Sequence, residues 1–261
     1  MTNQRRHLHP DAGICEAIAA RHPKPLVFAT VSGAHLYGFP SADSDYDVRG
    51  VHLMSLHEAL SMKEATGTIE SAGVEHGVEI DLVTHEVRKF MGLMLRPNGY
   101  VLEQLLSPIV IRTSPEHEEL RALAPACITR FHANHYLGFA RNQYDLFSRE
   151  DPPRVKPLLY VFRVLLTGIE LMRTGVIEAN IVRLNDSHGL SYLDELIARK
   201  IDGAEKSRLS MGDLEFYTRE YERLSALLVE EAGRTHLPEK ATAHDALDDL
   251  LLRLRLASGA K

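Results

Sequence analysis

The sequence predicts an α+β protein, in which a small mixed sheet flanked by helices is followed by a C-terminal helical region. Two patterns support this fold class. Up to residue 112, short apolar runs rich in valine, isoleucine and threonine alternate with turns, whereas beyond Ser114 and Pro115 the apolar residues recur with a helical period. A length of 261 residues and a hydrophobic content of 44% allow a sizeable core. We therefore expect two parts, residues 1–112 and residues 113–261.

The first part is expected to begin with a helix and a buried strand. Asp11 to Arg21 has a helical pattern, and Pro23 and Pro25 follow it as stop signals. The apolar run from Leu26 to Val31 then has the length and the β-branched content of a strand. After a polar turn, Val48 to Met54 continues a second strand.

A hairpin and a further helix are expected to complete the first part. Leu56–Met62 predicts a short helix, and Thr66–Ser71 and Gly73–Val83 predict two adjacent strands. In the second of these strands, apolar residues alternate with carboxylates, which places the two kinds on opposite faces. We expect Thr84 to cap a helix that runs through Arg96 and ends at the Pro-Asn-Gly that follows.

The second part contains amphipathic stretches with a helical period. They are Pro115–Ala124, Cys127–Ser148, Pro153–Arg173, Tyr192–Lys200, Met211–Ala232 and Ala241–Leu256. Apolar stripes of this kind either cover a sheet or support a homodimer, and the pattern leaves both open.

Composition limits the classes of function and the compartment. The net charge of −6 excludes a generally basic nucleic-acid-binding protein, because phosphate contacts need local positive charge. Residues 121–173 form the best local patch, with eight lysines and arginines against four aspartates and glutamates. The two cysteines, Cys15 and Cys127, have no paired spacing, which is typical of a reducing compartment. The polar N-terminus and the absence of long apolar runs predict a cytoplasmic protein with no membrane segment.

The end of the first predicted strand has the features of a phosphate loop. The strand leads into Ser32, Gly33 and Ala34. A glycine here allows the backbone to approach a phosphate closely, and the following residues can open a helix whose free N–H groups attract anions. We therefore expect Ser32, Gly33 and Ala34 to bind a nucleotide.

Carboxylates at alternate positions follow this loop. Asp45, Asp47 and Arg49 share one face if the segment is a strand. Carboxylate oxygens suit Mg²⁺ or Mn²⁺, which usually bind substrate phosphates as well, and a third carboxylate on a neighbouring strand commonly helps. Asp81 is our choice for that residue, with Glu79 as its alternative. We thus predict Asp45, Asp47 and Asp81 as catalytic metal ligands and Arg49 as a nucleotide ligand.

One face of a helix in the second part adds candidate nucleotide ligands. Lys156, Tyr160 and Arg163 lie at positions i, i+4 and i+7. We expect Lys156 and Arg163 to close over the triphosphate, and an ordinary solvated helix face is the structural alternative.

Together these motifs resemble the nucleotidyltransferase superfamily of DNA polymerase β. Its signature is an apolar strand, Gly-Ser or Gly-Gly, a gap of about ten residues and Asp-x-Asp, and here ten residues separate Gly33-Ala34 from Asp45-Tyr46-Asp47. More narrowly, the chain is similar to the predicted nucleotidyltransferases associated with RNA-repair pathways. The matching segments are Gly33–Gly38, Ser44–Gly50, Asp81 before Arg88-Lys89-Phe90, Asn98 with Leu102-Glu103, and Lys156 through Thr174-Gly175.

The resemblance implies transfer of a nucleoside monophosphate from a nucleoside triphosphate to an acceptor hydroxyl, with release of pyrophosphate. It also implies a divalent metal ion and suggests an RNA end as acceptor. Phe131, Tyr136, Tyr144 and Tyr160 in the basic section are candidates for stacking on bases, although core packing is the alternative for most of them at this spacing. Ala34 departs from the family, which usually has serine there. The lost hydroxyl contact is worth roughly 1 kcal/mol of nucleotide binding.

Other classes of function stay open on the sequence. Ala34 is compatible with a non-catalytic nucleotide-binding protein of the same fold, such as a sensor or an antitoxin-like regulatory partner. A glycosyltransferase or a phosphohydrolase can also use Asp-x-Asp with a metal ion. Retention of all three predicted carboxylates favours the active nucleotidyltransferase.

Overall fold

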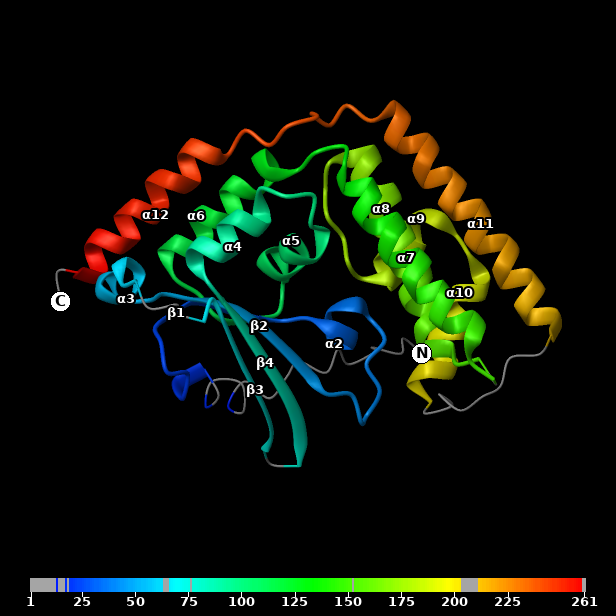
Figure 1. The fold of residues 1–261 in the computed structure, drawn as a ribbon. Coiled ribbons are helices and arrows are strands. Elements are labelled where there is room, and N and C mark those ends of the chain that lie inside the picture. Colours follow the sequence, from blue (N-terminus) through cyan, green and yellow to red (C-terminus); the bar gives the residue numbers. More distant parts are fainter. Residues whose placement is uncertain are drawn as a thin grey trace, which may run out of the picture.

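The computed structural model describes residues 13, 17, 19–62, 66–75, 77–151, 153–202 and 211–259. Cys15 and most of the expected helix from Asp11 to Arg21 lie outside these residues. The predicted fold class is confirmed, since a mixed sheet with helices is followed by a C-terminal helical region (Figure 1).

The sheet brings the predicted carboxylates onto neighbouring strands. Its strands are β1 (Leu26–Val31), β2 (Tyr46–His52), β3 (Thr68–Glu75), β4 (Val78–Glu86) and β5 (Val110–Arg112), in the spatial order β3-β4-β2-β1-β5. β2 and β4 are parallel, whereas the other neighbouring pairs are antiparallel. In the parallel pair, Asp47 lies in register with Asp81. The strand predicted at Leu26–Val31 is confirmed at both ends.

The hairpin and the helix after it differ in detail from the prediction. The hairpin turn does not lie between Ser71 and Gly73, because Gly73 continues β3, and Gly77 adopts the positive φ of 82° that the turn needs. Thr84 is not a helix cap. Its buried hydroxyl contacts the rings of His22 and His52, both at 2.9 Å, and the strand continues to Glu86.

Short helices cover one side of the sheet. They are α2 (Gly33–Tyr37), α3 (Leu56–Leu60), α4 (Val87–Met94) and α5 (Gly99–Leu106). The side chain of Glu86, rather than that of Thr84, caps α4. Helix α5 was not predicted, because it is only eight residues long and its cap, Asn98, follows a proline in a stretch typical of a turn.

The C-terminal region contains longer helices. They are α6 (Pro115–Leu123), the 3₁₀ helix η1 (Ala124–Cys127), α7 (His132–Arg149), α8 (Val155–Thr174), α9 (Ile181–His188), α10 (Ser191–Ile201), α11 (Met211–Arg234) and α12 (His244–Gly259). Five of the six predicted stretches agree within a few residues. The helix predicted from Cys127 begins five residues later, and α9 was missed, since its single short amphipathic stripe resembles a polar loop.

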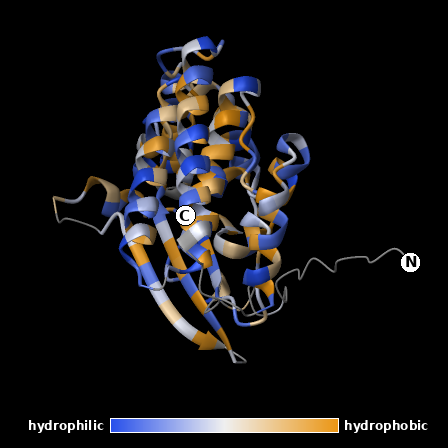
Figure 2. Ribbon diagram, turned by 90° about the vertical axis from the view of Figure 1, so that its right-hand side faces the viewer, coloured by the Kyte–Doolittle hydropathy of each residue, from blue (hydrophilic) through white to orange (hydrophobic). Residues whose placement is uncertain are grey.

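A shared core joins the two parts. Helix α8 packs against α7, α9, α10 and α11, and the main apolar cluster runs without interruption from β1 to α12. Helix α12 returns to the helices that cover the sheet and packs against α3, α4 and α6 (Figure 1). Hydrophobic and hydrophilic residues alternate around the helices in Figure 2, as expected where each helix buries one face. The division at residue 112 stays a prediction.

None of the helices within the described ranges is both long and apolar enough to span a membrane.

Candidate active site

The loop after β1 brings the backbone against the first carboxylates. The backbone N–H of Ser32 donates to the carbonyl of Asp47 at 2.8 Å. Gly33 has a φ of +62°, and a Cβ atom added there would lie 1.8 Å from Oδ2 of Asp47. No other residue fits this position without displacing the carboxylate, so Gly33 allows the loop and the Asp47 side chain to meet.

Ala34 points into the protein rather than into open solvent. It is 6% exposed and belongs to the main apolar cluster. Its methyl group cannot donate a hydrogen bond. Contacts from this position to a phosphate would therefore come from backbone N–H groups, as expected from the sequence.

Arg49 joins the two strands that carry the carboxylates. Its Nη2 atom donates to Oδ1 of Asp47 at 2.6 Å and to Oδ2 of Asp81 at 2.9 Å. Its Nη1 atom donates to the backbone carbonyls of Val48 and Asp81 at 3.0 and 2.7 Å. The structure thus brings Asp47, Arg49 and Asp81 together, and Asp45 lies half-buried just before β2.

The cluster carries more negative charge than Arg49 balances. Burial raises the pKa of the Asp47 carboxyl above its ordinary value. Repulsion from Asp45 and Asp81 adds to this rise, whereas Arg49 and Lys156 oppose it. A further cation near Asp47 would therefore be stabilising.

The donor set of this cluster fits a hard metal ion. Among the described residues, no three histidine, cysteine, aspartate or glutamate side chains are gathered in the arrangement of a metal site. However, Asp47 and Asp81 offer carboxylate oxygens from two neighbouring strands, and Asp45 directly precedes the first of them. Oδ2 of Asp47 is turned toward Gly33 rather than toward Arg49. Oxygen donors of this kind suit Mg²⁺ or Mn²⁺.

Tyr100 is a member of the site that the sequence did not reveal. Its hydroxyl accepts from Nε of Arg49 at 3.2 Å, and the two residues are 51 positions apart. Tyr100 lies in the first turn of α5, which the sequence analysis did not predict. No local pattern could have connected it with Arg49.

Helix α8 extends the site toward solvent. Lys156 is exposed, and its charge opposes the rise in the pKa of Asp47. Tyr160 is half-buried one turn further on. Burial raises the pKa of Tyr160 to about 12, with the negative charges of Asp47 and Asp45 adding to the increase. Lys156 and Tyr160 are thus close enough to the carboxylates to interact with them electrostatically.

Arg163, the third residue of that helix face, lies inside the protein. It is 2% exposed, its Nη1 atom donates to Oε2 of Glu103 at 2.8 Å, and its guanidinium lies 3.9 Å from the centre of the Tyr37 ring. Tyr37 belongs to α2, directly after the phosphate loop. The predicted contact of Arg163 with nucleotide stays untested, and this placement favours a role in supporting the loop.

Comparison with known proteins establishes the family. The model of the RNA repair pathway DNA polymerase beta family, RlaP, matches residues 11–253. The chain belongs to the RlaP family. This match spans the sheet, the carboxylate cluster and the helical region into α12, and it confirms the resemblance inferred from the sequence motifs.

Two relatives have similar sequences. Uncharacterized protein MJ0002 of Methanocaldococcus jannaschii is 30% identical over 192 residues, which cover 70% of this chain and 78% of that protein. Uncharacterized protein YcgL of Bacillus subtilis is 28% identical over 237 residues, covering 87% and 88% of the two chains. A solved nucleotidyltransferase-like protein from Exiguobacterium sibiricum is 12% identical, covers 95% of this chain and 74% of its own, and has a TM-score of 0.31.

Proposed function

We propose that this RlaP-family protein is an active, metal-dependent nucleotidyltransferase. It would move a nucleoside monophosphate from a nucleoside triphosphate to an acceptor hydroxyl and release pyrophosphate. The observation that carries the proposal is the in-register pair of Asp47 and Asp81 on parallel strands, with Gly33 against Asp47. This cluster joins metal-binding oxygens to a loop that a triphosphate can approach closely.

Different residues of the site have different roles in the proposed reaction. Asp45, Asp47 and Asp81 would hold Mg²⁺ or Mn²⁺, which supplies neutralisation of the phosphates and activation of the acceptor hydroxyl when bound. Arg49 keeps the two strands and their carboxylates in register, and Tyr100 orients its guanidinium. Lys156, exposed at the start of α8, would attract the triphosphate.

We propose an RNA end as the acceptor. The link of the RlaP family to RNA repair and the positive charge of residues 121–173 support this choice. The structure gives less support to the idea that the aromatic residues of this section stack on RNA bases. Tyr136 is fully buried, and Tyr144 stacks on Tyr221 with ring centres 4.0 Å apart. Tyr160 is half-buried and packs edge-on against Tyr37 and Phe39, whereas Phe131, at 44%, is the most exposed aromatic of the four.

Transfer of label tests the proposed reaction. The protein is incubated with each α-labelled nucleoside triphosphate, Mg²⁺ or Mn²⁺, and RNA, protein or small-molecule acceptors. We expect labelled RNA and an equal amount of pyrophosphate. Release of free nucleotide or phosphate without a labelled acceptor would indicate a hydrolase instead. If nucleotide binds but neither transfer nor hydrolysis occurs, the enzyme proposal is wrong.

A non-catalytic nucleotide-binding protein is the second candidate. The buried Ala34, which offers no hydroxyl to a phosphate, is the observation that favours it. On this alternative the protein would bind nucleotide, as a sensor or as an antitoxin-like regulator, and no product would form in the labelling experiment.

A pair of substitutions on β4 tests the choice of the third carboxylate. Asp81→Asn should lower kcat for transfer by about 10²-fold, since a carboxylate ligand of the proposed metal ion loses its charge. Glu79→Gln should change kcat by less than about twofold, because Glu79 is exposed and makes no contact with Arg49. Steady-state kinetics of both variants decide the point. The reverse order of effects would assign the role to Glu79.

A second pair of substitutions tests Lys156. Lys156→Gln should raise KM for the nucleoside triphosphate about tenfold with little change in kcat, as expected when a contact is equally strong in the ground and transition states. Arg154→Gln is the matched control, since Arg154 is two residues earlier on the same segment and already paired with Glu150. Equal KM values for the two variants would exclude Lys156 from nucleotide binding.

A further inference from the structure

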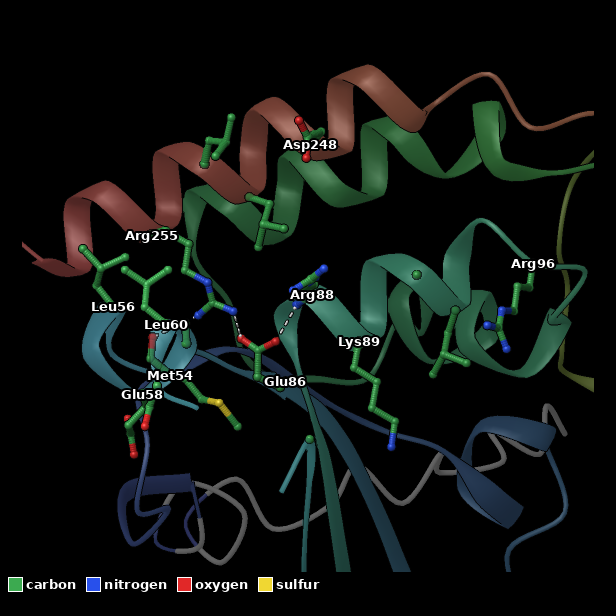
Figure 3. Close-up of a pocket in the computed structure, with 17 residues that line it drawn as sticks. Met54, Leu56, Glu58, Leu60, Glu86, Arg88, Lys89, Arg96, Asp248 and Arg255 are labelled. Carbon is green, nitrogen blue, oxygen red and sulfur yellow. Dashed lines mark hydrogen bonds and ion pairs between the residues drawn. The ribbon is translucent and has the colours of Figure 1, made fainter. Parts of the chain in front are cut away.

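A second pocket lies at the other end of the strands that carry the carboxylates. It encloses about 780 Å³ between α3, α4 and α12 (Figure 3), and Met54 and Glu86, which lie at or beyond the ends of β2 and β4, are among its lining residues. Asp81 and Glu86 are five residues apart on β4, which corresponds to about 17 Å at the usual strand rise of about 3.3 Å per residue. A ligand in this pocket would therefore not occupy the carboxylate site.

The charges around this pocket leave an excess of cations. Glu86 pairs with Arg255, as the dashed line in Figure 3 shows, and Glu58 pairs with Lys24. Three further cations line the pocket against one further carboxylate. These residues are Arg88, Lys89 and Arg96 on the positive side and Asp248 on the negative side. In a chain with a net charge of −6, this local excess favours an anionic ligand.

Two of these cations are available to a ligand. Arg88 and Arg96 are exposed, and within the described part of the chain neither guanidinium has a hydrogen-bond or ion-pair partner. Lys89 donates to the neutral hydroxyl of Thr68. Guanidinium groups form bidentate hydrogen bonds with phosphate oxygens. Arg88 and Arg96 therefore suit a ligand with phosphate groups better than an uncharged apolar compound.

Gly92 makes room beside these cations. It lies within α4 and lines the pocket, and a Cβ atom at this position would meet nothing within 4 Å. Its backbone has no positive φ that would require glycine. A glycine inside a helix costs roughly 0.5–1 kcal/mol relative to alanine. Neither packing nor backbone geometry requires glycine here, and its lack of a side chain leaves open space in the pocket wall.

The opposite wall of the pocket is apolar and open. Leu60 of α3 and Leu252 of α12 are 75% and 55% exposed, and Met54 and Leu251 continue the same surface. Leucines that remain in solvent beside free cations favour a ligand with both an apolar or planar body and anionic groups. The volume lies within the range of about 300–1,000 Å³ typical of small-molecule sites.

We infer that this pocket binds a nucleotide through its phosphate groups. The phosphates would lie against Arg88, Lys89 and Arg96, and the ribose and base would cover Gly92 and the leucine wall. The same chemistry has two sources, a free nucleotide or the terminal nucleotides of an RNA strand. The inference does not depend on the proposed transfer reaction, because the pocket shares no residue with the carboxylate site.

Binding without divalent metal ions tests this site separately from the carboxylate site. In EDTA, uncompensated carboxylates repel phosphates, so binding of nucleotide should report on the second pocket. ATP is titrated by calorimetry, and a short fluorescent single-stranded RNA by anisotropy. The double variant Arg88→Glu with Arg96→Glu should bind at least tenfold more weakly. Arg112→Glu with Arg219→Glu, two exposed positions outside the pocket, makes the same charge change and should bind normally.

Filling the pocket gives an independent test. Gly92→Leu should weaken binding at least tenfold while keeping or raising Tm, since leucine favours a helix more than glycine. Gly138→Leu, at an exposed glycine of α7 that also has open space around it, should keep binding and, for the same reason, keep or raise Tm. If the pocket variants bind ATP more weakly, the ligand is a free nucleotide. If they bind only RNA more weakly, the ligand is the end of an RNA strand. Absence of binding at millimolar ATP and micromolar RNA, or binding that both pocket variants leave unchanged, would overturn the inference.

Discussion

Asp47→Asn is expected to lower kcat for nucleotidyl transfer by about 10³-fold, equivalent to about 4 kcal/mol of transition-state stabilisation. Asp47 contacts Gly33 on one side and Arg49 on the other, so it lies where the phosphate loop meets the carboxylate cluster. Asparagine keeps the shape of the side chain and removes its charge. The folded protein should tolerate this change, because burial and two neighbouring carboxylates already raise the pKa of Asp47.

The labelling assay measures the expected loss of transfer, and thermal unfolding measures the expected retention of stability. Transfer of label to RNA should disappear while Tm stays within a few degrees of the unchanged protein. Asp43→Asn is the matched control, since Asp43 is exposed in the loop before β2 and should retain transfer. Equal loss in both variants would mean that the loop, rather than the Asp47 carboxylate, is needed. Retained transfer in Asp47→Asn would refute the proposed metal site.

Glu103→Leu should have the largest effect on stability, lowering the free energy of unfolding by about 3–5 kcal/mol. The side chains of Glu103 and Arg163 are 1% and 3% exposed, and they form an ion pair of 2.8 Å. Removal of the carboxylate leaves a guanidinium buried without its counter-ion. Because Arg163 also lies over the ring of Tyr37, the helix after the phosphate loop should loosen at the same time.

A double-variant cycle in urea separates the charge effect from packing. Glu103→Leu combined with Arg163→Met should recover most of the lost free energy, since apolar residues of similar volume often replace a buried ion pair without net cost. Glu119→Ala, which breaks the exposed ion pair with Arg253, should cost less than about 1 kcal/mol. If Glu103→Leu were as mild as Glu119→Ala, the buried pair would not be a stabilising element of the site.

Much of the sheet and of the carboxylate cluster could be predicted because the signals are local. An apolar run of six residues between turn signals identifies β1, and the spacing of Asp45 and Asp47 depends only on strand geometry. By contrast, Thr84 has the sequence of a cap but continues a strand, because His22 and His52 use its hydroxyl. Tyr100 could not be predicted for a related reason, since its hydrogen bond with Arg49 joins elements that are far apart in the chain.

Lys156 and Arg163 show the same limit on one helix. Their spacing places them on one face, and both are cations, yet Lys156 is exposed and Arg163 is buried against Glu103. Helical period determines which residues share a face, but the depth at which each lies depends on the elements packed against that face. A few neighbouring residues are enough to show which side chains share a helix face, whereas the depth at which each is buried depends on the whole fold.

The sequence by itself determined the fold class, the order of loop and carboxylates, the RlaP-like motifs and the departure at Ala34, since each depends on residues near one another in the chain. Only the tertiary structure decided that Asp81 lies in register with Asp47, that Arg49 joins them, and that Arg163 supports Tyr37. The pocket between α3, α4 and α12 belongs to this second group. Its walls come from segments about 200 residues apart, which meet because burial of the apolar face of α12 brings that helix back onto α3, α4 and α6.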